Sequence, residues 1–480
     1  MARFLPELER GFGRAPFLDP FPPCSRASRL SHLPVPARRQ VGSVGWNMGA
    51  DQAGPGPGRR RVLRGALGLI GAAGAVAAGG RSAPAAERTA DPSAADPASG
   101  NLPPHVPEWM TRQGAPVLSP PYGAPSPFEA GVVRRPRSHS PTTTAASSST
   151  PLQDLHGIIT PNGLHFERHH AGVPKIDPAQ HRLMVHGLVE RPLLFSMGEL
   201  MRFPSVSRVH FIECSGNSAW AEPPPKATVQ DIHGLISCCE WTGVPLSAVL
   251  AEAGVRPGAA WVLAEGADAA ALTRSIPIAK ALDDAILAYA QNGERLRPEQ
   301  GYPLRLLLPG YEGNMSVKWL RRLKLGDQPF ETREETAKYT DLMPDGTARQ
   351  FTFVMEAKSL ITFPSGGQRL EAQGFYEISG LAWSGRGRIV RVEVSTDGGR
   401  SWWDAELQAP VLTKALTRFR LPWRWDGTPA QLRSRATDET GYVQPEREAL
   451  IQARGLNSGY HYNGIQTWSV AADGSVTYVA

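Results

Sequence analysis

Cysteine is scarce in this 480-residue chain, which contains only Cys24, Cys214, Cys238 and Cys239. Cys24 lies in an N-terminal segment that we interpret below as a leader. The remaining three are an odd number and two of them are adjacent, so they do not predict a disulfide framework. The motif Cys-x-x-Cys-His is absent as well. Its absence excludes a covalently attached c-type haem in this chain.

A surplus of positive charge is missing from most of the chain, although the formal net charge is +6. Residues 1–85 hold 12 Lys and Arg against 4 Asp and Glu, which leaves a net charge of −2 for residues 86–480. A protein that binds a phosphate backbone needs clustered Lys and Arg. We therefore expect no nucleic-acid partner.

Long hydrophobic runs are also lacking. The most apolar segment, Gly65 to Gly80, is rich in Gly and Ala, and it is short for a membrane span. It follows Arg59-Arg60-Arg61 and precedes Ala83-Pro84-Ala85, which is the pattern of a twin-arginine export signal with a small-residue cleavage site. We interpret residues 48–85 as this signal; the alternative is a transmembrane anchor. An export signal predicts a periplasmic protein that has no membrane segment after cleavage.

Residues 1–47 do not resemble the beginning of an export signal. They contain Trp46, several Phe and many Pro, whereas a start at Met48 leaves a charged segment of ordinary length. We expect translation to begin at Met48 and residues 1–47 to be a non-translated extension. A peptide from residues 1–47 in the cell's proteome would contradict this.

Residues 86–150 are rich in Pro, Ser, Thr and Ala, and the run of Thr and Ser at 142–149 alone is typical of disorder. Trp109, Met110, Tyr122 and Phe128 are nevertheless spread through the segment. We expect an irregular N-terminal arm that packs over the core.

The rest of the chain divides near residue 345. Residues 151–345 mix short apolar strands, such as 182–186, 209–212 and 304–308, with helical candidates at 246–252 and 278–282. They show no regular strand–helix repeat, so an α+β fold is favoured over a doubly wound one. Residues 346–475 contain runs that alternate in period two, such as 389–394 and 432–436, separated by Asp-Gly turns. Such runs predict an antiparallel β-sandwich.

Cys214 ends an apolar run and begins the small-residue turn Cys214-Ser215-Gly216-Asn217. Two interpretations stay open from these residues alone. A thiolate is a soft donor that suits a transition metal, but a cysteine without such a role is commonly a small buried hydrophobe. Cys238 and Cys239 are interpreted as structural.

Several blocks, in order, resemble the sulfite oxidase family of molybdenum enzymes over nearly all of residues 155–470. They are Cys214-Ser215-Gly216-Asn217, Ser275-Ile276-Pro277-Ile278, Asn292-Gly293-Glu294, Gly301-Tyr302-Pro303-Leu304-Arg305 and Ser316-Val317-Lys318-Trp319-Leu320. The resemblance implies a molybdopterin domain followed by an immunoglobulin-like domain that forms homodimers. It also implies a molybdenum–molybdopterin cofactor.

The resemblance assigns roles residue by residue. Cys214 is the implied metal ligand. The implied cofactor contacts are His169, His170, Cys214, Asp268, Gln300, Arg305, Ser316, Val317 and Lys318. The implied catalytic residues are Arg168, Tyr339 and Arg454. Fixed cations suit an anionic sulfur substrate because guanidinium groups bind oxyanions through paired hydrogen bonds.

Each of these residues also has a purely structural interpretation. Arg168 could be a surface charge, Arg454 a salt bridge at a domain interface, Tyr339 a loop cap and Lys318 an ordinary strand edge. His165, His169 and His170 could form a zinc site, although no Cys or carboxylate accompanies them at structural-zinc spacing. The joint order of the blocks favours the family roles.

The chain departs from the family pattern near the substrate. Family members carry paired arginines after the Cys-x-Gly-Asn turn, where this chain has Ser218-Ala219-Trp220, and a histidine where this chain has Gln300. The tract 163–170 and the arm segments 107–110 and 119–123 are similar to the molybdenum subunits of sulfane dehydrogenases of the Sox sulfur-oxidation system. That branch implies a c-type cytochrome subunit and a substrate of sulfane sulfur on a carrier protein. The alternatives are a periplasmic sulfite dehydrogenase and, more remotely, a non-catalytic binding module that keeps the fold.

Overall fold

The computed structural model describes residues 125–137, 142–218, 223–456 and 459–479. The predicted start codon and export signal lie outside these residues, as do Trp109, Met110 and Tyr122 of the arm. Ala219 and Trp220, which follow the Cys214 turn, lie outside them too. Within the described ranges, no helix has the length and apolarity needed to cross a bilayer.

Two five-stranded sheets form the part of the molecule before residue 330. In the first sheet every pairing is antiparallel; its members are β6 (Val206–Glu213), β7 (Ile236–Pro245), β10 (Ile286–Gln291), β11 (Glu294–Arg295) and β12 (Arg305–Leu307). The second sheet contains β4 (Arg182–Gly187), β5 (Leu193–Ser196), β8 (Trp261–Gly266), β9 (Thr273–Pro277) and β13 (Leu320–Gly326). In that sheet only β4 and β13 pair in parallel.

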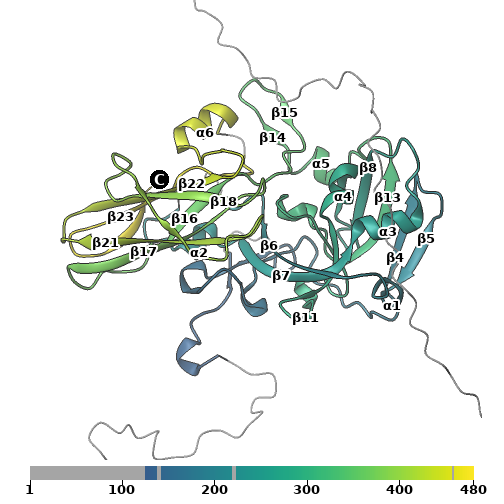
Figure 1. Cartoon of the computed structure of the whole chain (residues 1–480), viewed down its shortest axis with the longest axis horizontal. Coiled ribbons are helices and arrows are strands. Elements are labelled where there is room, and N and C mark those ends of the chain that lie inside the picture. The colour runs from purple at the N-terminus through teal and green to yellow at the C-terminus, as the bar shows by residue number, and fades with distance from the viewer. Residues whose placement is uncertain (1–124, 138–141, 219–222, 457–458, 480) are drawn as a thin grey trace, which may run out of the picture. The chain divides into compact units, whose positions relative to one another are not determined.

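Short helices complete this part of the molecule. They are α1 (Met197–Leu200), α2 (Val229–His233), α3 (Leu246–Ala253), α4 (Ile278–Asp283) and α5 (Arg333–Thr336). The helices α3 and α4 contact each other and lie against the second sheet (Figure 1). Apolar side chains from both sheets and from α3 meet in one core, which includes Leu183, Val244, Leu250, Leu287 and Leu323. Mixed strands and helices with one parallel pairing confirm the predicted α+β fold.

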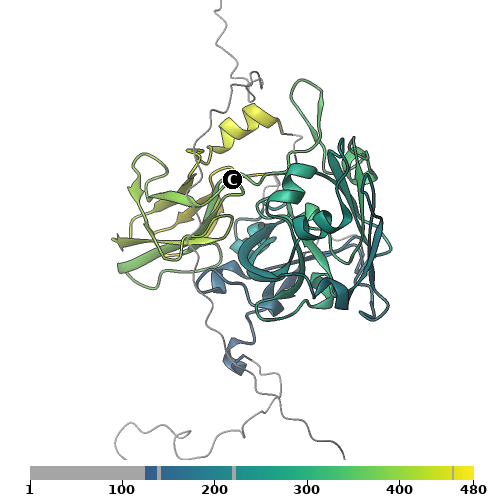
Figure 2. The same cartoon turned by 45° about the vertical axis from the view of Figure 1, so that its right-hand side comes forward.

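Two antiparallel sheets form the part after residue 357. One sheet consists of β16 (Lys358–Phe363), β17 (Gly374–Trp383), β20 (Glu406–Leu407) and β21 (Thr417–Trp425). The other consists of β18 (Ile389–Ser395), β19 (Trp403–Asp404), β22 (Ala430–Asp438), β23 (Thr467–Val470) and β24 (Val476–Val479). Both contribute to one core that contains Trp383, Phe419 and Trp468. The predicted β-sandwich is therefore present, and its strands, coloured green to yellow, gather together in Figures 1 and 2.

Two elements lie at the edges of this part. The hairpin of β14 (Asp341–Leu342) and β15 (Ala348–Arg349) contains the predicted boundary at residue 345. The helix α6 (Arg447–Arg454) follows β22 and ends at Gly455, whose positive φ of 77° suits a glycine after a helix.

The described end of the N-terminal arm is ordered by strand pairing. β1 (Arg135–Pro136), β2 (Ser147–Ser149) and β3 (Glu167–Arg168) form an antiparallel sheet. The serine run whose composition is typical of disorder is therefore a strand, because β3 and the buried bond from Thr150 N to Gly234 O hold it in place. Phe128 does not pack over the core, contrary to expectation: it is 96% exposed.

Candidate active site

The turn that carries Cys214 follows directly from β6, whose end is buried. The backbone N–H of Asn217 donates to the carbonyl of Cys214 at 2.9 Å and closes the turn. The buried Asn217 side chain then donates to Glu213 at 3.0 Å and accepts from the backbone N–H of Leu235 at 3.1 Å. These bonds fix the backbone on both sides of the thiol, so the small residues of the motif serve a tight, fully bonded turn.

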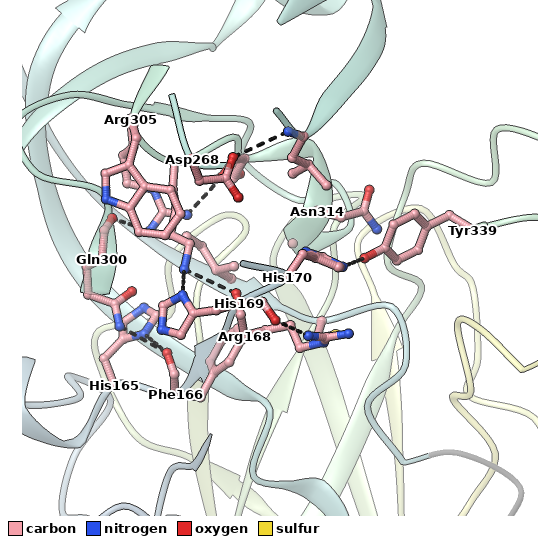
Figure 3. A pocket seen from close by; sticks show the side chains of 17 residues that line it. His165, Phe166, Arg168, His169, His170, Asp268, Gln300, Arg305, Asn314 and Tyr339 are labelled. Carbon is pink, nitrogen blue, oxygen red and sulfur yellow. Dashed lines mark hydrogen bonds between the residues drawn. The ribbon is translucent and has the colours of Figure 1, made fainter. Parts of the chain in front are cut away.

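A cavity lies beside this thiol. Figure 3 shows the side chains that surround it. Ten of the predicted site residues line it: Arg168, His169, His170, Cys214, Asp268, Gln300, Arg305, Ser316, Lys318 and Tyr339. They come from segments far apart in the sequence, so the fold brings together residues that the motifs could only place in order.

Two predicted residues do not line the cavity. The side chain of Val317 is fully buried in the core, and its carbonyl accepts a hydrogen bond from Leu306 N at 2.9 Å. The Arg454 guanidinium donates to Glu356 and to the carbonyl of His461, both at 2.8 Å. Arg454 thus forms a salt bridge within residues 346–475, not one at the predicted domain interface, and a direct catalytic role for it stays a prediction.

Sequence reasoning missed other lining residues. They are His165, Phe166, Ile212, Leu272, Gly313, Asn314 and Trp319. His165 had been considered only for zinc, and the described residues contain no cluster of three or more His, Cys, Asp or Glu that could hold a metal ion. The available signal was that Trp319 belongs to the Ser316–Leu320 block and that Asn314 lies two residues before this block.

Backbone carbonyls hold the cationic side chains of the cavity. Arg305 donates to the carbonyls of Gln300 and Ser316, both at 3.0 Å. Lys318 donates to the carbonyls of Arg168 at 3.1 Å and Glu299 at 3.0 Å, and its Nζ lies 2.8 Å from His169 Nδ1. Neither side chain forms an ion pair within the described residues, so each would be available to pair with a bound anion.

The backbone at position 301, where the Gly301–Arg305 block begins, favours glycine. Its φ is +108°, and a Cβ there would lie 3.1 Å from the Cβ atoms of both Arg305 and Lys318. A side chain at position 301 would therefore push the two cations apart.

Burial controls the protonation of the site. It lowers the pKa of Arg305 to about 9 and that of Lys318 well below its usual range, the latter with help from the positive charge of Arg305. Burial also raises the pKa of the Cys214 thiol, while the N–H of Gly216 and the charge of Arg168 act in the opposite direction. Buried cationic side chains that have no ion-pair partner among the described residues mark a site that suits an anionic ligand.

Tyr339 and His170 form a hydrogen-bonded pair at the side of the cavity, with Tyr339 Oη 3.1 Å from His170 Nε2 (Figure 3). Burial and the charge of Arg168 lower the pKa of His170 to about 4, and burial raises the pKa of Tyr339. At neutral pH the histidine is therefore neutral and the tyrosine holds its proton. The Tyr339 ring also contacts Tyr460 and lies under the Arg274 guanidinium at 5.2 Å.

Two neutral histidines, the buried His165 and the partly buried His210, predict an acid-sensitive fold. Burial lowers the pKa of His165 to about 3 and that of His210 to about 4, against about 6.5 in an unfolded chain. Between pH 6.5 and 4 the unfolded chain binds protons that the folded chain does not. The free energy of unfolding should therefore decrease as the pH is lowered from 6.5 to 4, by about 1.4 kcal/mol per pH unit for each such histidine. Urea titrations across this range would measure the slope.

His210→Gln offers a matched control for this slope. His210 lies outside the cavity, and its Nδ1 lies 3.3 Å from the carbonyl of Lys414, a distance that a Gln amide can span. The variant should show a slope reduced by about one proton. An unchanged slope would contradict the assignment of a neutral His210.

Comparisons with known proteins agree with this fold. Residues 170–334 match the family model described as "Oxidoreductase molybdopterin binding domain", and residues 349–467 match "Mo-co oxidoreductase dimerisation domain". Mitochondrial sulfite oxidase of Mus musculus is 32% identical and aligns with 73% of this chain and 69% of its own length. Sulfite oxidase of Gallus gallus is 33% identical, with 75% of this chain and 85% of its own length covered.

A solved structure is more similar in sequence. The crystal structure of the sulfane dehydrogenase SoxCD from Paracoccus pantotrophus matches with a TM-score of 0.76 and 49% identity, and the alignment covers 80% of this chain and 99% of that chain. The fold and site thus define a molybdopterin-dependent oxidoreductase. The chain belongs to the sulfite oxidase family, and the predicted likeness to sulfane dehydrogenases within it is confirmed.

The cavity fits the cofactor of that family. Its lining carries three cationic side chains, Arg168, Arg305 and Lys318, against the single carboxylate of Asp268. Arg305 Nε and His165 Nε2 are buried and have no hydrogen-bond partner among the described residues. Buried polar atoms are normally bonded, so these two await a ligand with polar atoms. A phosphate-bearing pterin would supply negative charge for the cations and polar atoms for the two buried nitrogens. A transition metal would bind the Cys214 thiolate.

Proposed function

We propose that this protein oxidises sulfane sulfur, carried on a cysteine of a carrier protein, to sulfonate. It passes the electrons to a c-type cytochrome subunit, since this chain has no haem-attachment motif of its own. The observation that carries the proposal is the 49% identity with a sulfane dehydrogenase over 99% of that chain. The cation-lined cavity beside Cys214 supports it because the product is an anion.

The residues divide into those that hold the cofactor and those that face the substrate. Cys214 would be the thiolate ligand to molybdenum, and Arg305, Lys318 and the Ser316 segment would hold the pterin and its phosphate. When bound, this cofactor supplies a two-electron redox centre that transfers an oxygen atom to sulfur. The charge of Arg168 acts on Cys214, His170 and Tyr339, so Arg168 is placed to bind the oxyanion of the substrate or product.

Tyr339 contributes a proton held at its Oη. Its raised pKa keeps the hydroxyl protonated, and neutral His170 orients that hydroxyl through the 3.1 Å contact. A positioned, uncharged hydroxyl can donate to an oxygen that gains negative charge without adding another charge to the cavity.

The identity of the substrate is tested directly by comparing two sulfur compounds as electron donors to the cytochrome. Purified protein with its cytochrome subunit should reduce the cytochrome when given a carrier protein that bears a cysteine persulfide. Free sulfite should be a poor substrate in the same assay. Rapid sulfite turnover without activity on the carrier would favour the alternative, a sulfite dehydrogenase, which the 32–33% identity with sulfite oxidases supports.

Metal analysis tests the cofactor and the enzyme class together. The protein isolated from a molybdenum-replete host should contain about one molybdenum per chain. Protein that lacks molybdenum and pterin altogether would contradict both enzymatic proposals and leave the non-catalytic binding module.

Location and assembly form part of the same proposal. The residues at 48–85 support export through the twin-arginine pathway to the periplasm, and the match of residues 349–467 to a dimerisation domain supports a homodimer. A fusion of residues 48–90 to a reporter should be exported, and changing Arg59, Arg60 and Arg61 to lysine should block export. Light scattering of the purified protein should give twice the mass of one chain.

Arg168→Gln should lower kcat/KM by about 100-fold, because loss of one positioned donor to a developing oxyanion costs at least this much. Arg168→Lys should recover only part of the loss, since an ammonium cannot form the paired guanidinium bonds. Steady-state kinetics on the carrier substrate measure both. Arg135→Gln, an exposed arginine of β1 in the same small sheet, is the matched control and should retain activity.

A further inference from the structure

Glu213, the residue directly before Cys214, is a buried carboxylate with both oxygens engaged. It is 1% exposed. Its Oε1 accepts from Lys358 at 3.0 Å and from Asn217 at 3.0 Å, and its Oε2 accepts from the indole of Trp383 at 2.7 Å. The strand end that leads into the cavity thiol is therefore anchored by its side chain.

Two of these three donors come from the β-sandwich. Lys358 begins β16 and Trp383 ends β17, and the two residues are direct partners in the antiparallel register. Side chains of paired residues extend from the same face of a sheet, so one corner of the sandwich presents an ammonium and an indole N–H together. Both are fully or almost fully buried.

Lys358 also holds the other end of the Cys214 turn. Its Nζ donates to Ser218 Oγ at 2.7 Å, and Ser218 Oγ lies 2.6 Å from Nδ1 of buried His233. Ser218 has a φ of 60°, a left-handed conformation that a non-glycine residue adopts only when its surroundings hold it. One ammonium thus binds the residue before the turn and the residue after it.

A purely stabilising ion pair is the simpler interpretation of Glu213 and Lys358. Buried ion pairs are weak evidence for stability, because apolar residues of similar volume often serve equally well. The charge pairing does not require the additional bond from Lys358 to Ser218. With that bond, Lys358 and Trp383 hold Glu213 on one side of the thiol and Lys358 holds Ser218 on the other, and we call this set of bonds the bracket around the Cys214 turn.

We propose that Lys358 is a positioning residue for the Cys214 thiol, so that the β-sandwich takes part in forming the active site. Together with Trp383, it fixes the turn between Glu213 and Ser218 and thereby the direction from which sulfur binds the metal. This inference rests on the proposed function, because it assumes that Cys214 is the metal ligand.

The test is a set of variants in the intact protein, with Glu213→Gln and Lys358→Met combined so that no lone charge is left buried. We expect the double variant to keep its molybdenum and to melt close to the wild type. Its Mo(V) electron paramagnetic resonance g-values should shift, and kcat should fall at least about 10-fold, the usual effect of losing a group that orients a metal ligand. KM should change little. The single variant Lys358→Arg, which keeps Glu213, should retain more of kcat than the double variant does.

Lys414→Met is the matched control. Lys414 also joins the two parts of the molecule, through a 2.6 Å ion pair with Asp284, but neither residue lines the cavity. The control should keep the wild-type resonance signal and kcat.

The outcomes separate this inference from the proposed function. A double variant that is folded and loaded with metal, with unchanged g-values and kcat, would overturn the role of Lys358. If the double variant does not fold, Ser218→Ala and Trp383→Phe each remove one bond of the bracket, and an unchanged signal in both would overturn it equally. Wild-type protein without molybdenum would instead overturn the proposed function itself.

Discussion

Replacing Cys214 with serine should give a folded protein that oxidises no sulfur substrate. A serine hydroxyl does not ionise near neutral pH, so it would not supply the anionic sulfur donor that the Cys214 thiolate would give the metal. Loss of a residue that only orients a metal ligand costs about 10- to 100-fold. Loss of the ligand itself should therefore exceed about 100-fold in kcat. Kinetics and molybdenum content, measured on the same preparation, check this result.

The fold should survive because the bonds of the turn do not involve the sulfur. Cys214 N donates to the carbonyl of Leu235 at 3.0 Å, and its carbonyl accepts from Asn217 N. Cys238→Ala is the matched control: Cys238 is a free, fully buried thiol in β7, and its loss should cost roughly 1 kcal/mol of stability without changing turnover. A Cys214→Ser variant with undiminished activity would remove Cys214 from the role of ligand.

Arg274→Met should destabilise the protein by about 3–5 kcal/mol, the usual cost of breaking a buried ion pair from one side. Arg274 and Glu312 are 1% and 2% exposed, and Arg274 Nη2 lies 3.0 Å from Glu312 Oε1. The same guanidinium donates to the carbonyl of Glu334 at 2.9 Å. Without it, Glu312 would be a buried carboxylate held only by His461 and Asn314. Denaturant titration at pH 7 measures the loss.

The loss should also depend on pH. Burial alone would raise the pKa of Glu312, but His461 and Arg274 together hold it below its usual value. The ion pair therefore contributes stability above the unfolded pKa of about 4.3, and this contribution disappears as pH falls through the folded pKa. The difference between wild type and variant should shrink below about pH 4.

Arg391→Met is the control for this prediction. Arg391 pairs with Asp404 at 2.6 Å, and the two side chains are 53% and 67% exposed. It also pairs with the buried Glu393, which would keep its two hydrogen bonds from Arg435. Exposed pairs contribute about 0–1 kcal/mol, so this change should have little effect at any pH. Equal losses in the two arginine variants would contradict the distinction that burial makes.

The sequence was sufficient where a residue's role depends on local pattern. The period-two runs at 389–394 and 432–436 became β18 and β22, and the helical candidates became α3 and α4. The Cys214 turn, Arg305 and Lys318 line one cavity because the order of the family blocks reflects a shared fold. Local pattern and family order together therefore predicted most of the cavity.

The sequence was insufficient where a role depends on distant partners. Arg454 looks like a site residue by its motif, yet Glu356 and His461 engage it away from the cavity. The run at 142–149 looks disordered by composition, yet strand β3, almost twenty residues later, holds its end as β2. Glu213 and Lys358 carry no motif at all. Their importance appears only when residues 145 positions apart lie 3.0 Å apart.

The bracket around the Cys214 turn has a consequence for the order of events during synthesis. The turn bonds to Lys358 and Trp383, and His461 N donates to the carbonyl of Ser215 at 2.8 Å. A nascent chain that has just emerged past the first two sheets contains the thiol but not these three partners. The complete set of bonds around the turn can therefore form only after nearly the whole chain has left the ribosome.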